Sequence, residues 1–194
     1  MIVAITGGIG SGKTTVAKVF ETMGCVLYNS DEKAKELYFD LEIKHKVIEL
    51  FGAEAYLQNG QLNREFISGK VFENKALLEK LNSIIHPAIK LDFENFVNQQ
   101  LPETIIIKES ALIFETGLYK NFEPIILVTA PIEQKIERVV KRNSTTRAEV
   151  EKRMNAQWTD QQKLPLAHFV ITNSNTDAVI PQVVKVLEEI KSHV

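Results

Sequence analysis

The chain has 194 residues, of which 44% are hydrophobic, so it is long enough to bury one core and too short for two comfortable domains. Its formal net charge of -2 excludes a broad attraction to nucleic acid or to acidic membrane surfaces, and we expect neither as a partner. The single cysteine, Cys25, cannot form an internal disulfide, and no apolar run approaches the roughly 18 residues of a membrane span, so we predict a cytoplasmic protein and favour a monomer.

The first fifteen residues, MIVAITGGIGSGKTT, hold the most specific pattern in the chain. Ile2–Ile5 is an apolar run typical of a short buried strand, and Gly7 opens the spacing G-x-x-x-x-G-K-T, which ends at Thr14. Glycines tolerate positive φ and carry no Cβ, so successive backbone N–H groups can face a phosphate where the next helix begins. We expect Lys13 to reach the β- and γ-phosphates of a nucleotide and the Thr14 hydroxyl to bind Mg²⁺. The alternative is a glycine-rich turn that only joins a strand to a helix.

The residues after this loop predict a helix and then a second strand. The helix is expected over Thr14–Met23 and the strand over Cys25–Tyr28, and a charged helix over Glu32–Tyr38 follows, for which Ser30 is a possible N-cap. Ligands of parallel sheets lie beyond the C-terminal ends of the strands, and Asp31 falls there. From spacing alone, Asp31 is equally well explained as a catalytic carboxylate and as a helix-capping one.

Residues 41–100 have the periodicity of helices rather than strands. The expected helices are Ile43–Phe51, Arg64–Phe72, Asn74–Ile85 and Ala88–Val97. Because about sixty residues are too many for a simple crossover, we expect this insertion to hold the acceptor substrate. The pair His86-Pro87 is expected to separate the last two helices, and His86 is more simply explained as a structural histidine than as a ligand.

Three further apolar runs predict strands, namely Thr104–Lys108, Ile125–Thr129 and Phe169–Thr172. Glu109 follows the first of them, where a carboxylate could hold a magnesium-bound water, and Glu115 lies a few residues further along. Either carboxylate could also be a solvated loop charge.

Between the fourth and fifth strands we expect two helices rich in positive charge, Ile132–Arg142 and Arg147–Trp158, the second with a Thr146–Glu149 capping box. Arg138 and Arg142 are four residues apart and share a face, with Lys135 adjacent. A basic lid that folds over the polyphosphate is the functional interpretation, and a charged surface hairpin is the alternative.

Together with a closing helix over Ala178–Ile190, these elements predict an α/β fold: a doubly wound, five-stranded parallel sheet with a phosphate-binding loop (P-loop), a helical substrate-binding insertion and a small basic lid. We expect one domain, with its core in residues 1–30, 101–142 and 165–194, the insertion in about 31–100 and the lid in about 143–164. A small-molecule kinase is favoured over a nucleotide-driven switch, because the N-K-x-D signature of guanine-specific switches does not occur in the sequence.

Several motifs then narrow the choice of acceptor substrate. They are ITGGIGSGKT over Ile5–Thr14, Asp31, Gly60–Arg64 with Val71–Phe72, Ile85–Pro87, Leu112–Glu115, and Arg153 with Gln157. With these motifs the sequence resembles the dephospho-coenzyme A kinase family over essentially its whole length. The resemblance implies ATP- and Mg²⁺-dependent phosphorylation of the ribose 3′-hydroxyl of dephospho-coenzyme A, the last step of coenzyme A synthesis. Another nucleoside or nucleotide kinase, and a nucleotide-gated binding protein, remain the alternatives.

Phosphoryl transfer needs a basic clamp, which Arg138, Arg142 and Arg153 could provide, and a carboxylate for the attacking hydroxyl. The resemblance places that carboxylate at Asp31 and places His86 and Lys90 in the acceptor-binding region. We therefore expect Asp31, as the base, with Lys13 and Arg142 as the catalytic residues. ATP would be bound by Gly8, Ile9, Gly10, Ser11, Gly12, Lys13, Thr14, Arg138, Arg142 and Asn173, and Mg²⁺ by Thr14. The acceptor would be bound by Asp31, Lys35, His86, Lys90 and Glu115. The sequence departs from the family pattern at Asn29, where an Asp is usual, at Ala111 in place of a Pro, and at His168 in place of an Asp.

Overall fold

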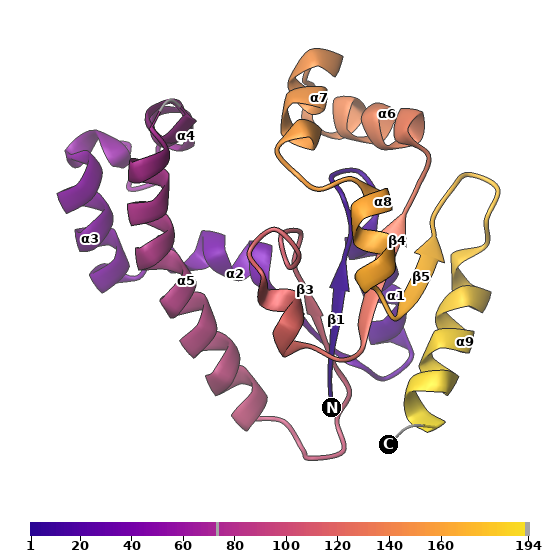
Figure 1. The fold of residues 1–194 in the computed structure, drawn as a ribbon. Helices are drawn as coiled ribbons and strands as arrows, with labels where there is room; N and C mark the ends of the chain where they lie inside the picture. The colour runs from indigo at the N-terminus through magenta and orange to yellow at the C-terminus, as the bar shows by residue number, and fades with distance from the viewer. Residues whose placement is uncertain (73, 193–194) are drawn as a thin grey trace. The chain divides into compact units, whose positions relative to one another are not determined.

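The computed structural model describes residues 1–72 and 74–192, so residues 193 and 194 at the end of the expected core lie outside it. The chain divides into two compact units, the first made of Met1–Asn29 with Leu101–Val194 and the second of Ser30–Gln100 (Figure 1). The second unit spans the helical segment expected between the second and third strands. Among the described residues, no helix is both long enough and apolar enough to cross a membrane.

The first unit contains a five-stranded sheet in which every pairing is parallel, as predicted. Its strands are β1 (Ile2–Thr6), β2 (Val26–Asn29), β3 (Ile106–Glu109), β4 (Ile125–Thr129) and β5 (Phe169–Thr172), in the order β2-β3-β1-β4-β5. The chain leaves β1 toward one edge to build β2 and β3 and toward the other to build β4 and β5. The C-terminal end of β1 is therefore the switch point, where open α/β sheets bind ligands.

Both faces of the sheet are covered by apolar side chains, which is why its strands are continuous apolar runs. On one face, α1 (Lys13–Thr22) and α9 (Val179–Ser192) pack on β1 and β4 through Phe20 and Leu187, and Cys25 lies in the same buried cluster. On the other face, Ile113 and Phe114 cover Ala4 and Leu127, next to the short helix η2 (Leu118–Asn121). The sheet is therefore packed between apolar layers on both faces.

The helices between β4 and β5 differ from the prediction at one end. The first, α6 (Ile132–Asn143), is as expected, but α7 (Arg147–Asn155) ends before Trp158 and is followed by α8 (Asp160–Lys163) and η3 (Leu164–Leu166). The reason is a capping box at Thr159, whose side chain accepts from the Gln162 N–H while the Gln162 side chain accepts from the Thr159 N–H. At Thr146 the expected cap accepts from the Glu149 N–H, but the Glu149 carboxylate bonds Thr145 instead of completing the box.

The second unit is helical. It contains α2 (Ser30–Leu37), α3 (Leu41–Phe51), η1 (Ala53–Ala55), α4 (Arg64–Phe72) and α5 (Lys75–Asn98). Asp40 caps α3 by accepting from two N–H groups, and Gly52 ends it. The helix α2 begins at Ser30, so Ser30 is not the expected N-cap ahead of it.

The expected break at His86-Pro87 is wrong, because α5 runs without interruption through Pro87. An internal proline removes one backbone hydrogen bond and costs about 3 kcal/mol. The helix α5 packs against α2, α3 and α4, and it buries Leu81 and Ile85 in their common core. Burial of side chains of this size recovers about 1.5 to 3 kcal/mol each, which outweighs the local preference of Pro87.

Candidate active site

The loop from Gly7 to Gly12 joins β1 to α1 and has the backbone that a phosphate nest requires. Gly10 and Gly12 have φ of 79° and 85°, in the left-handed region. A Cβ on Gly10 would lie 2.3 Å from the Lys135 carbonyl oxygen, and one on Gly12 would lie 2.0 Å from Asn173 Nδ2. Both positions therefore need glycine for conformation and for space. Gly12 precedes the first turn of α1, so the unpaired N–H groups and the positive end of that helix face the loop.

A buried carboxylate lies beside the end of the loop. Thr14 Oγ1 donates to Glu109 Oε1 at 2.5 Å, and Lys13 Nζ lies 3.9 Å from the same oxygen. Asn29 Nδ2 donates to Glu109 Oε2 at 2.9 Å, because the register pairs Asn29 with Glu109 across β2 and β3. The Glu109 side chain is only 1% exposed, so its interpretation as a solvated loop charge is wrong.

The residues around Thr14 suit a magnesium ion. Mg²⁺ prefers hard oxygen ligands and usually keeps one or two protein oxygens together with phosphate and water. The Thr14 hydroxyl and the Glu109 carboxylate supply such oxygens, and the described residues contain no cluster of three or more His, Cys, Asp or Glu side chains that would form a cage of protein ligands. The sequence predicted Thr14 for this role and left Glu109 open; the contact with Asn29 was missed, because it depends on strand register.

Two of the residues expected at the nucleotide lie against the loop. Asn173 Nδ2 donates to the Ser11 carbonyl oxygen at 2.9 Å. Arg138 donates through Nη2 to Gln134 and Asn175, while its buried Nη1 finds no hydrogen-bond acceptor among the described residues and lies 4.0 Å from where a Gly12 Cβ would stand. A buried guanidinium N–H without a partner beside an anion nest indicates that an anion completes its hydrogen bonding.

Arg142 and Arg153, by contrast, lie on exposed parts of α6 and α7. Arg142 is exposed one turn further along α6, where its Nε donates to Asn143 Oδ1 at 3.0 Å, and Arg153 is exposed in the last turn of α7. Arg147 donates to both Glu133 and Glu151, which ties α7 to α6 and holds the pKa of Glu133 below its ordinary value. Residues 143–164 carry four basic and three acidic side chains. The positive charge of the expected lid is therefore partly neutralised by its own carboxylates.

The residues expected at the acceptor divide between the two units. Asp31 is in the first turn of α2, and Lys35 forms an ion pair with Glu32 at 2.5 Å on the same helix. His86 and Lys90 are both exposed and lie four residues apart, so the continuous α5 presents them on one face. Their roles stay predictions.

Glu115, the fifth expected acceptor ligand, belongs to the first unit and has internal partners. Its Oε1 accepts from the Trp158 N–H at 2.8 Å and lies 2.8 Å from the fully buried Lys163 Nζ. It is therefore not a solvated loop charge; it fastens the segment before α8 to the segment after β3. Whether it also binds an acceptor stays a prediction.

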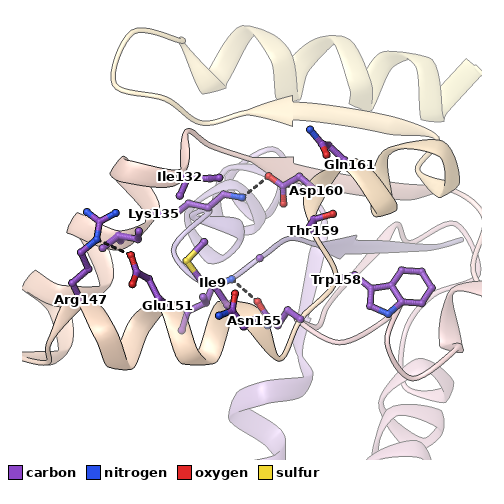
Figure 2. Close-up of a pocket in the computed structure, with 14 residues that line it drawn as sticks. Ile9, Ile132, Lys135, Arg147, Glu151, Asn155, Trp158, Thr159, Asp160 and Gln161 are labelled. Carbon is purple, nitrogen blue, oxygen red and sulfur yellow. Dashed lines mark hydrogen bonds and ion pairs between the residues drawn. The ribbon is translucent and has the colours of Figure 1, made fainter.

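A cavity of about 570 Å³ opens beside Gly8 and Ile9, between α6, α7 and the segment before α8 (Figure 2). Ile132, Ile136, Met154 and Trp158 are among its apolar lining residues. Lys135 is 3% exposed and forms an ion pair with Asp160 at the cavity. The Ile9 N–H donates to Gln157 Oε1 at 2.9 Å, a contact that no sequence pattern indicated.

The family model described as dephospho-CoA kinase matches residues 1–178. A dephospho-CoA kinase of Chlorobium chlorochromatii (strain CaD3) is 35% identical over 97% of this chain and 92% of its own length, and one of Chlorobaculum tepidum is 36% identical over 98% and 95%.

A solved structure has the same fold over nearly the whole chain. The crystal structure of TT1252 from Thermus thermophilus covers 98% of this chain and 97% of its own, with a TM-score of 0.88 and 27% identity. The family match and the identity to full-length relatives agree with the loop, the sheet order and the Thr14–Glu109 pair seen here. This chain therefore belongs to the dephospho-CoA kinase family.

Proposed function

We propose that the chain transfers the γ-phosphoryl group of ATP to the ribose 3′-hydroxyl of dephospho-coenzyme A, giving coenzyme A and ADP. The observation that carries this proposal is the Thr14–Glu109 pair at the end of the phosphate loop, at the switch point of a parallel sheet, in a chain of this family. The loop and Lys13 would bind the polyphosphate, with Arg138 and Asn173 completing the site beside Gly12.

Mg²⁺ would be held by the Thr14 hydroxyl and the Glu109 carboxylate, and when bound it would offset negative charge on the phosphate oxygens. Asn29 orients the carboxylate for this task by donating to its second oxygen, so that one face of Glu109 is directed to Thr14. An Asn at this position leaves Asp31, two residues further on, as the carboxylate that can act as base after β2.

Asp31 would accept the proton of the 3′-hydroxyl while that oxygen bonds to the γ-phosphorus and the bond from phosphorus to the ADP oxygen breaks. Lys13 and Arg142 would stabilise the charge on the transferring group, and Arg142 would reach it from the exposed face of α6. Lys35, His86, Lys90 and Glu115 are proposed to bind the acceptor. Residues 143–164 are proposed as the lid, and a monomer in the cytoplasm is the expected state.

The test is to incubate the purified chain with Mg-ATP and dephospho-coenzyme A and to look by mass spectrometry for a product heavier by one phosphoryl group. Lys13→Ala and Asp31→Asn serve as matched inactive variants, and adenosine as a control acceptor. Coenzyme A formed by the wild type alone supports the proposal. Phosphorylation of adenosine instead would favour a nucleoside kinase, and ATP hydrolysis indifferent to any acceptor would favour a nucleotide-gated binding protein.

A further inference from the structure

Ile9 is joined to the α6–α7 pair in two independent ways. Its backbone N–H donates to Gln157 Oε1 at 2.9 Å, just after the end of α7. Its side chain packs against a buried cluster formed by Ile136 and Val139 of α6 and Val150 of α7. The third residue of the phosphate loop therefore contacts this helical pair through both its backbone and its side chain.

Gln157 is itself held in place from both sides. Its own N–H donates to the Met154 carbonyl oxygen at 3.0 Å, so it continues the last turn of α7. The next residue, Trp158, donates its N–H to Glu115 at 2.8 Å and stacks on Phe114 with ring centroids 6.5 Å apart. A shift of α7 therefore moves the side chain that binds Ile9, whereas the far side of the segment is anchored to the sheet.

The hydrogen bond fixes the peptide plane between Gly8 and Ile9. Gly10, the next residue, must hold a φ of 79° with its backbone against the Lys135 carbonyl, so the direction of this plane decides whether the following N–H groups converge. A loop that is ordered before the nucleotide arrives does not lose that conformational entropy on binding.

We propose that Gln157 is a positioning residue that couples the phosphate loop to α7, so that a bound nucleoside di- or triphosphate and a docked α7 stabilise each other. This inference rests on the proposed function, since it needs a nucleotide in the loop. Because coupling between two binding events is reciprocal, nucleotide should protect the end of α7, and loss of the coupling should weaken nucleotide binding. The effect should fall on affinity and not on the transfer step, because the bond is the same before and during transfer.

The first experiment measures the ADP dissociation constant of Gln157→Leu by calorimetry and the hydrogen exchange of residues 147–158 with and without ADP. We expect affinity to fall about tenfold, the usual consequence of leaving a partly buried N–H without its partner, while kcat changes less than about twofold. The ADP-induced protection of α7 should disappear. The control is Gln161→Leu, because Gln161 lines the same cavity and its side chain makes no hydrogen bond among the described residues.

A second pair of variants tests the N–H group itself. Ile9→Ala keeps the donor and loses the side chain, whereas Ile9→Pro loses both, and Ile9 is not among the residues whose positive φ would exclude proline. Adding Gln157→Leu should weaken ADP binding about tenfold in the Ile9→Ala background and less than about twofold in the Ile9→Pro background.

Equal effects in the two Ile9 backgrounds would overturn the proposal, as would an unchanged affinity and exchange pattern in Gln157→Leu. So would a uniform rise in exchange across the first unit that ADP does not alter, because that is the signature of a purely structural role. A wild-type chain that binds no ADP would instead contradict the proposed function.

Discussion

Asn29→Asp gives the sharpest test of the carboxylate site. The change replaces the amide donor 2.9 Å from Glu109 Oε2 by a second carboxylate. Two unit charges at that separation of 2.9 Å repel by about 6 kcal/mol at an effective dielectric constant of about 20. Rotation of the new side chain and Lys13, 3.9 Å from Glu109, offset part of this repulsion, so we expect unfolding free energy to fall by about 2 to 4 kcal/mol without Mg²⁺.

The pH dependence separates this repulsion from a simple loss of a hydrogen bond. In Asn29→Asp the two carboxylates raise the folded pKa of one of them above its unfolded value, so the folded state binds more protons than the unfolded state. The loss of unfolding free energy relative to wild type should therefore be small near pH 4 and should grow as the pH rises toward neutrality. Asn29→Ala loses the hydrogen bond to a charged acceptor, about 1.5 to 3 kcal/mol, without adding a second charge, so its loss of stability should depend less on pH.

The assay is thermal unfolding of both variants in EDTA and in MgCl₂ between pH 5 and pH 8. At about 2 to 4 °C per kcal/mol for a chain of this size, Asn29→Asp should melt about 5 to 15 °C below wild type in EDTA at pH 8. Mg²⁺ should restore most of that loss, since it would neutralise the repulsion between the two carboxylates. It should leave the difference between Asn29→Ala and the wild type nearly unchanged, because both keep Thr14 and Glu109. A deficit in Asn29→Asp that neither pH nor Mg²⁺ alters would refute the assignment of Glu109 to the metal site.

Three further expectations follow from other parts of the structure. Asp31→Ala should lower kcat about 10²- to 10⁴-fold while the ATP dissociation constant stays within about threefold. The neighbouring Glu32→Gln should change neither kcat nor the dissociation constant, and steady-state kinetics with calorimetry measures both quantities. Full turnover in Asp31→Ala would remove Asp31 from the role of base. Gly12→Ala should abolish measurable nucleotide binding, because its Cβ would lie 2.0 Å from Asn173 Nδ2. Gly69→Ala in α4, where a Cβ would have nothing within 4 Å, should instead stabilise the protein by about 0.5 to 1 kcal/mol. Equal nucleotide affinity in the two variants would contradict the steric argument. Burial raises the pKa of Tyr56 to about 12, so the stability that its neutral hydroxyl gives is present below pH 10 and is lost as the pH rises to 12. In denaturant titrations, the difference in unfolding free energy between wild type and Tyr56→Phe should therefore shrink over that interval. A constant difference would count against the raised pKa.

The strands and the phosphate loop could be predicted because their signals are local. Ile125–Thr129 and Phe169–Thr172 are continuous apolar runs, and the structure has β4 and β5 at those bounds. The Gly-rich spacing from Gly7 likewise specifies its own backbone. Where a short run of residues decides the conformation, sequence reasoning succeeded.

Sequence reasoning failed where contacts with residues distant in the chain decide the conformation. Pro87 is a helix breaker by local preference, yet packing of α5 on three other helices overrides it. The burial of Lys135 likewise depends on its pairing with Asp160, from another helix, a partner that the spacing of the basic residues does not identify. The Asn29–Glu109 contact depends on the register between two strands 80 residues apart, which no local pattern encodes.

Cys25 is a built-in probe of how often the protein core opens. It is the only cysteine of the chain, it is 5% exposed in the cluster that joins β1 to α1 and α9, and burial raises its pKa, so the reactive thiolate is scarce in the folded state. A thiol reagent can therefore label it only when the core opens, and the labelling rate measures the free energy of that opening. Any ligand that occupies the phosphate loop should slow the reaction in proportion to its binding, without a tag, a dye or a substitution.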